Sequence, residues 1–162
     1  MQRIAEKDQV PAEPACTTGL NELEASAWTG FLRAHVTLVR ELDEELTARH
    51  GLPLSSYDVL VQLEGAPDGR LRMSHLADAV LLSRSGLTRL VARLVDQGLI
   101  ERVECAGDAR GAFAAITPLG RERLDEARET HRAGVRERFL AKLGEQDLRQ
   151  LARAWSRLLD PR

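Results

Sequence analysis

The chain has 162 residues, of which 43% are hydrophobic and 30% are charged, as in ordinary globular proteins. This length predicts one domain with helical extensions. The balance of 23 basic and 25 acidic side chains gives no overall sign of nucleic-acid binding, so such a partner has to be inferred from the local arrangement of charges. No apolar run reaches the roughly 18 residues that cross a bilayer, and the first residues show no hydrophobic signal core. With only two cysteines, Cys16 and Cys105, we expect a cytoplasmic protein without a disulfide framework.

The first half of the chain predicts an arm followed by two helices. Residues 1–19 contain Pro and Gly without periodicity, which indicates a flexible arm. Apolar residues then recur at three- and four-residue steps over residues 20–50, which predicts a long amphipathic helix ending at Gly51. A second helix should begin after Pro53, where Ser55 and Asp58 have the spacing of a capping pair.

Residues 74–116 predict two short helices followed by a hairpin. Ser74 should cap the third helix, the chain should turn at residues 80–82, and Ser83 should open the fourth helix. Two short apolar runs, residues 100–105 and 112–116, enclose a polar turn and predict a β-hairpin. Two short helices joined by a turn and followed by such a hairpin are typical of a winged helix-turn-helix, whose second helix enters the DNA major groove.

The last part of the chain predicts two more helices. Thr117 followed by Pro118 is a helix-start signal, Gly144 interrupts the pattern, and a final helix should cover residues 145–159. The predicted fold is therefore mainly α with a small β-hairpin wing (α+β). We expect a dimerisation helix at residues 20–50, a winged helix-turn-helix at 51–117 and C-terminal dimerisation helices at 118–162, because the flanking helices carry more apolar surface than one small domain covers.

The fourth predicted helix carries the candidate DNA-reading face. Its apolar positions form one stripe, whereas the other face has arginines, short hydroxyl side chains and no acidic residue before Asp96. Such side chains suit phosphates and base edges, and an arginine at the hairpin tip suits a narrow minor groove. An ordinary solvated helix face is the alternative. The candidate DNA-binding residues are Ser83, Arg84, Ser85, Thr88, Arg89, Arg93, Asp108 and Arg110.

These segments resemble the MarR family of winged-helix transcription regulators. The matching segments are residues 82–89 of the fourth helix, 98–102 at the strand entry, 107–111 of the wing and 116–120 at its exit. The resemblance implies a homodimer that binds a palindromic operator in double-stranded DNA, with Thr88, Arg89 and Arg110 at DNA-contacting positions. It also implies that a small effector, often aromatic or phenolic, releases the protein from DNA. The candidates for effector contact are Trp28, Phe31, His35, Tyr57 and Asp58, although the aromatic residues among them could equally be core.

The sequence leaves two alternative functions open. Cys105 near the wing could make the protein a redox-responsive regulator, or a helical dimer could act through protein partners without DNA. An enzyme is not expected, because the sequence has no GxSxG, P-loop, GxGxxG after a strand, or HExxH motif. The four histidines lack metal-ligand spacing, so we expect neither a metal nor another cofactor.

Overall fold

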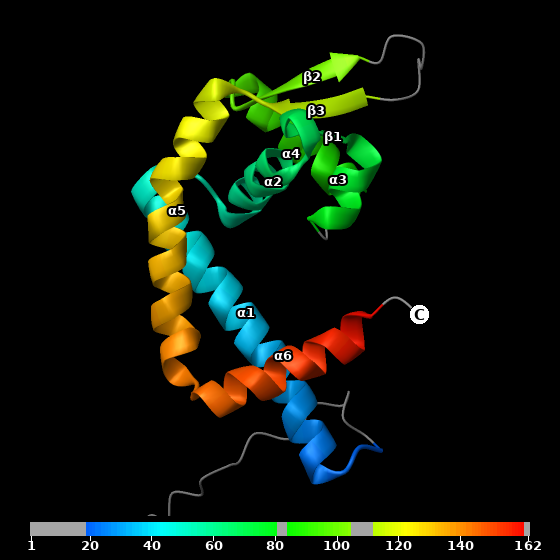
Figure 1. Ribbon diagram of the computed structural model, residues 1–162, viewed down its shortest axis with the longest axis vertical. Helices are drawn as coiled ribbons and strands as arrows, with labels where there is room; N and C mark the ends of the chain where they lie inside the picture. Colours follow the sequence, from blue (N-terminus) through cyan, green and yellow to red (C-terminus); the bar gives the residue numbers. More distant parts are fainter. Residues whose placement is uncertain (1–18, 81–83, 105–111, 161–162) are drawn as a thin grey trace, which may run out of the picture. The chain divides into compact units, whose positions relative to one another are not determined.

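A computed structural model describes residues 19–80, 84–104 and 112–160 (Figure 1). The chain divides into two compact units, the first ending at Thr37 and the second beginning at Leu38. No helix in the described ranges combines the length and apolar character that a membrane span requires. In chain order the elements are α1 (Glu22–His50), α2 (Leu54–Gly65), the 3₁₀ turn η2 (Pro67–Gly69), β1 (Arg70–Arg72), α3 (Met73–Ala79), α4 (Arg84–Asp96), β2 (Ile100–Glu104), β3 (Ala112–Ile116), α5 (Pro118–Arg138), the 3₁₀ turn η3 (Leu140–Lys142) and α6 (Glu145–Leu159).

The core of the second unit lies where α2, α3, α4 and the start of α5 meet a small sheet. Leu60, Leu63, Leu76, Leu94 and Leu124 have no solvent-accessible surface. Five such side chains, each contributing about 1.5–3 kcal/mol on burial, come from four different helices and fix their packing. The predicted mainly helical fold with a small sheet is confirmed.

The sheet has three antiparallel strands in the order β1-β3-β2. β2 and β3 form the predicted hairpin, with Ile100 opposite Ile116 and Val103 opposite Phe113. A third strand at residues 70–72 was not predicted. This strand, β1, pairs with the other side of β3, with Arg72 opposite Phe113. Three residues are too few to show the two-residue alternation of a strand, so β1 can be identified only from its pairing with β3.

Two predicted helix caps are wrong. The side chain of Ser55 does not cap α2, whose N-cap is Pro53; instead Asp43 Oδ1, on the preceding helix, accepts a hydrogen bond of 2.8 Å from the backbone N–H of Leu54. Ser74 does not cap α3, because that helix already begins at Met73 with Arg72 as its N-cap. A cap needs only an acceptor at the first N–H groups, and a residue distant in sequence supplies it for α2.

The start of α5 is as predicted. Thr117 is its N-cap, its Oγ1 accepts a 3.0 Å hydrogen bond from the Gly120 N–H, and Pro118 occupies the first turn. The same Oγ1 donates to the Gly98 carbonyl at 2.7 Å. One threonine therefore connects the end of α4, the sheet and α5.

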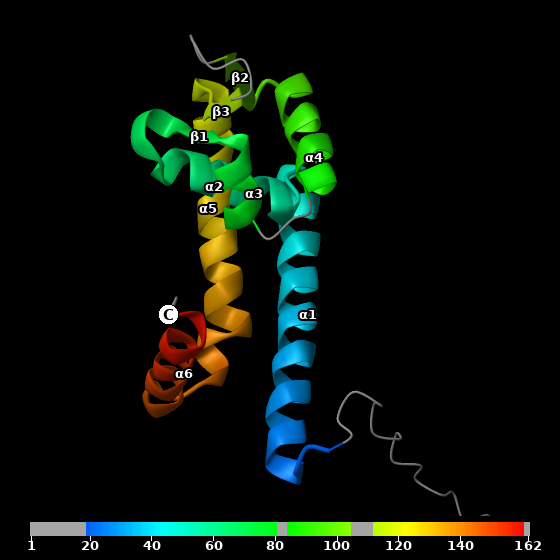
Figure 2. The same ribbon diagram turned by 90° about the vertical axis from the view of Figure 1, so that its right-hand side faces the viewer.

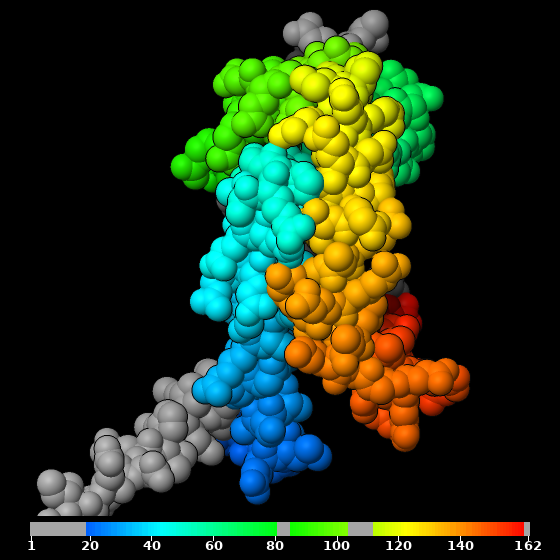
Figure 3. Space-filling model, turned by 90° about the vertical axis from the view of Figure 1, so that its left-hand side faces the viewer, coloured from blue at the N-terminus to red at the C-terminus, as the bar shows by residue number. Residues whose placement is uncertain are grey.

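Residues 38–50 of α1 pack along α5, as the blue-green and yellow surfaces of Figure 3 show. Arg138 lies 2.8 Å from Glu45 and 3.4 Å from Glu41, and His50 Nε2 is 2.7 Å from Thr130 Oγ1. These contacts, together with Asp43, fix this part of α1 on the winged-helix region.

Candidate nucleic-acid interface

Helix α4 has one fully buried and one exposed face. Leu87, Leu90, Val91 and Leu94 are at most 3% exposed, which confirms the predicted apolar stripe. Figure 2 shows α4 beside α3, the helix that precedes it in the predicted helix-turn-helix. The buried stripe therefore fixes the rotation of α4 about its own axis, and with it the direction of every other side chain.

The other face of α4 presents the predicted DNA-reading side chains to solvent. Ser85, Thr88, Arg89 and Arg93 are all exposed, and so is the small residue Ala92 between them. The only acidic residue of α4 is Asp96, its last residue. An exposed helix face with arginines, hydroxyls and one small side chain fits the depth and the donor–acceptor pattern of the major groove.

The rest of the predicted interface falls outside the described residues. This applies to Ser83, to Asp108 and Arg110 of the wing, to the side chain of Arg84, and to both cysteines, Cys16 and Cys105. The strands β2 and β3, which lead into and out of the wing, are described and paired over their whole length.

A pair of arginines that the sequence analysis did not single out lies on β1. The guanidinium carbons of Arg70 and Arg72 lie 5.8 and 5.4 Å from the centre of the Phe113 ring. Arg70 also forms a 3.2 Å ion pair with Asp68, and the side chains of these two residues are 49% and 76% exposed. Only the pairing of β1 with β3 brings the three residues together, so the sequence carried no signal for this cluster.

Three effector candidates belong to the first unit. The rings of Trp28 and Phe31 are 6.0 Å apart and those of Phe31 and His35 are 6.2 Å apart, each pair tilted. Trp28 is 45% and Phe31 41% exposed, so within the chain they are not core residues. They form an aromatic strip along one side of α1.

The other two candidates, Tyr57 and Asp58, lie on α2 next to α5. Tyr57 is 5% exposed and its ring stacks on that of His131 at 4.6 Å. Desolvation raises the pKa of Asp58, an effect partly offset by His131, and it lowers the pKa of His131 below its ordinary value of 6.5. Both groups are therefore biased toward their neutral forms. No local sequence pattern connects His131 with Tyr57 and Asp58, because these two residues of α2 are more than 70 positions away in the chain.

Metal binding has no support in the described part of the chain. Within residues 19–80, 84–104 and 112–160, no three His, Cys, Asp or Glu side chains come together in a way that could hold an ion.

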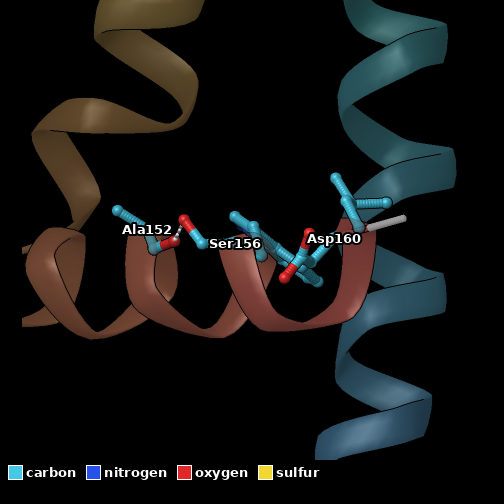
Figure 4. A pocket seen from close by; sticks show the side chains of 5 residues that line it. Ala152, Ser156 and Asp160 are labelled. Carbon is cyan, nitrogen blue, oxygen red and sulfur yellow. Dashed lines mark hydrogen bonds between the residues drawn. The ribbon is translucent and has the colours of Figure 1, made fainter. Parts of the chain in front are cut away.

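Helix α6 exposes its apolar face. None of its residues is buried; Trp155 is 37% exposed, and Leu158 and Leu159 are each 73% exposed. Figure 4 shows a shallow, open hollow lined by α6 and by Asp160, the residue that follows it; Ser156 Oγ there donates to the Ala152 carbonyl at 3.0 Å. A hollow formed by one helix is part of a surface and does not enclose a small molecule.

Comparison with known proteins identifies the fold. A family model described as MarR family matches residues 50–111. The crystal structure of AbsC, a MarR family transcriptional regulator from Streptomyces coelicolor, superposes with a TM-score of 0.80 at 32% identity, covering 87% of this chain and 95% of AbsC. The chain belongs to the MarR family.

Two further MarR family regulators from Streptomyces coelicolor are similar. Sco3205, solved in complex with DNA, gives a TM-score of 0.81 at 32% identity over 87% of this chain and 89% of its own. Sco5413 superposes with a TM-score of 0.73 at 25% identity, covering 85% of this chain and 94% of Sco5413. A search of curated proteins gave no match. As a MarR family protein, the chain is a DNA-binding transcriptional regulator and not an enzyme.

Proposed function

We propose that the protein acts as a homodimer that binds a palindromic operator and represses transcription until a small aromatic or phenolic effector releases it. In this proposal α4 enters the major groove, where Ser83, Arg84, Ser85, Thr88, Arg89 and Arg93 contact bases and phosphates. The wing, with Asp108 and Arg110, reaches the adjacent minor groove.

The observation that carries the proposal is the exposed face of α4. Four leucine and valine side chains hold one side of the helix in the core, and Ser85, Thr88, Arg89 and Arg93 occupy the accessible side. A solvated helix face would be expected to mix acidic and basic residues, whereas this one has no carboxylate before its last position. The relative Sco3205 was solved in complex with DNA, which supports DNA binding as the role of this chain.

Homodimer formation is supported by apolar side chains that the single chain leaves exposed. On α6 these are Trp155, Leu158 and Leu159, and on α1 they include Trp28, Phe31 and Val36, which are 41–64% exposed. Large exposed apolar surfaces on a small protein mark interaction sites, and a self-complementary pairing of two copies covers them by symmetry. Two subunits would then place two copies of α4 on half-sites about one helical turn apart.

The operator experiment uses fluorescence anisotropy with duplexes from the region upstream of the gene, narrowed to a palindrome of about 16–20 bp. Thr88→Ala and Arg89→Ala should each weaken binding by about 1–3 kcal/mol and relax the preference for one base pair per half-site. Gln62→Ala, at an exposed position of α2, is the matched control and should bind like the wild type. Unchanged affinity and base preference in both α4 variants would refute the assignment of α4.

The effector part of the proposal rests on the exposed aromatic strip of α1 in the first unit and, separately, on Tyr57 and Asp58 in the second. The probe is salicylate, titrated into the operator complex. Salicylate and simple phenols should release DNA from the wild type. Trp28→Ala or Asp58→Asn should change the effector concentration at which half of the DNA is released. If none of these compounds changes DNA binding at any concentration, the result contradicts the proposal that these residues form a binding site for such effectors.

A further inference from the structure

Arg72 occupies a junction between two elements of the winged helix-turn-helix. It is the last residue of β1 and the N-cap of α3. In a helix-turn-helix the first helix crosses the DNA backbone while the second lies in the major groove. If α4 is the second helix, a side chain at the start of α3 lies near the phosphates on the edge of that groove.

The structure also holds this arginine in place. Arg72 is exposed, and its guanidinium carbon is 5.4 Å from the centre of the partly buried Phe113 ring, directly across the β1–β3 pair. Phe113 is the second residue of β3, the strand that returns from the wing. The negative face of an aromatic ring attracts a cation, so an arginine already held over the ring loses less side-chain freedom when it binds an anion.

Arg70 differs although it is on the same strand and near the same ring. It lies at the far end of β1 from α3, two residues farther from the helix that would approach DNA. Arg70 therefore serves as an internal control for Arg72.

We propose that Arg72, positioned by the Phe113 ring, binds a backbone phosphate of the operator beside the groove that α4 occupies. A planar guanidinium presents paired N–H donors that match the oxygens of a phosphate. The contact carries no base information, so it adds affinity to every DNA sequence. This inference rests on the proposed DNA binding by α4.

The test compares Arg72→Gln with Arg70→Gln, which removes the same charge two residues away. Dissociation constants are measured on the operator duplex and on an unrelated duplex between 0.05 and 0.3 M salt. Losing one phosphate contact in each of two half-sites reduces the slope of log K against log salt by about 1.8 and weakens binding about 60-fold at 0.1 M salt. Arg72→Gln should show these changes on both duplexes, and Arg70→Gln should leave the slope unchanged.

Phe113→Leu separates positioning from charge. Because Arg72 keeps its charge in this variant, the salt slope should be retained while the affinity falls less than in Arg72→Gln. Thermal unfolding of each variant checks that the fold is intact. If Arg72→Gln and Arg70→Gln give equal affinities and slopes while the wild type binds DNA, the inference is wrong. If the wild type binds no DNA, the proposed function itself fails.

Discussion

The apolar end of α6 offers a direct test of the proposed homodimer through Leu158→Glu. Leu158 is 73% exposed in the single chain, so a charge there should leave the fold of one subunit intact. Complete burial of a leucine contributes about 1.5–3 kcal/mol, and burying the exposed 73% in a dimer would contribute about 1–2 kcal/mol per copy. A two-fold interface contains the residue twice, which gives about 2–4 kcal/mol and a dimer dissociation constant about 30- to 700-fold higher.

Sedimentation equilibrium over a range of protein concentrations measures this change. The matched control is Gln146→Glu, which adds the same charge to α6 at an exposed position nine residues before Trp155 and hence on the opposite side of the helix. The control should dimerise and bind the operator like the wild type, while Leu158→Glu should form monomers and lose operator affinity. Equal dimer dissociation constants for the two variants would refute the argument that this apolar face is the interface.

Two further predictions concern stability. Gly120→Ala should destabilise the fold by about 1–3 kcal/mol in urea unfolding, because a Cβ at this position would overlap the Leu99 carbonyl oxygen and crowd Ile116. A Cβ at Gly30 on α1 would meet no atom within 4 Å, so the control Gly30→Ala should not destabilise the protein. Equal losses of stability in the two variants would contradict the close contact between Gly120 and Leu99. The second prediction concerns the pH dependence of stability. Because the pKa of His131 is lowered, the folded state favours the neutral imidazole. The protein should therefore keep its stability above pH 6.5, the ordinary pKa of histidine, and lose stability as the pH falls from 6.5 through the lowered pKa. His131→Gln should make the urea-unfolding midpoint less dependent on pH in that window, whereas the raised pKa of Asp58 acts in the opposite direction as the pH rises from its ordinary value of 3.8; a variant with the wild-type pH dependence would refute the role of His131.

The elements of this fold follow largely from local sequence signals. The three- and four-residue spacing of apolar positions predicted α1, α4 and α6, and Thr117 with Pro118 predicted the start of α5. These signals succeed because periodicity and capping act between residues a few positions apart. The exposed face of α4 could be predicted for the same reason, since the buried stripe of a helix determines which residues lie opposite it.

The features that local sequence did not predict depend on contacts between segments that are distant in the chain. Asp43 caps α2 from another helix, β1 exists because it pairs with β3, and His131 stacks on Tyr57 across more than 70 residues. The position of Arg72 over Phe113 likewise depends on the strand register. No local pattern encodes such partners, because their energies arise only after the chain has brought the segments together. The sequence thus determined which faces the helices expose, and the tertiary structure determined which polar groups meet at their ends.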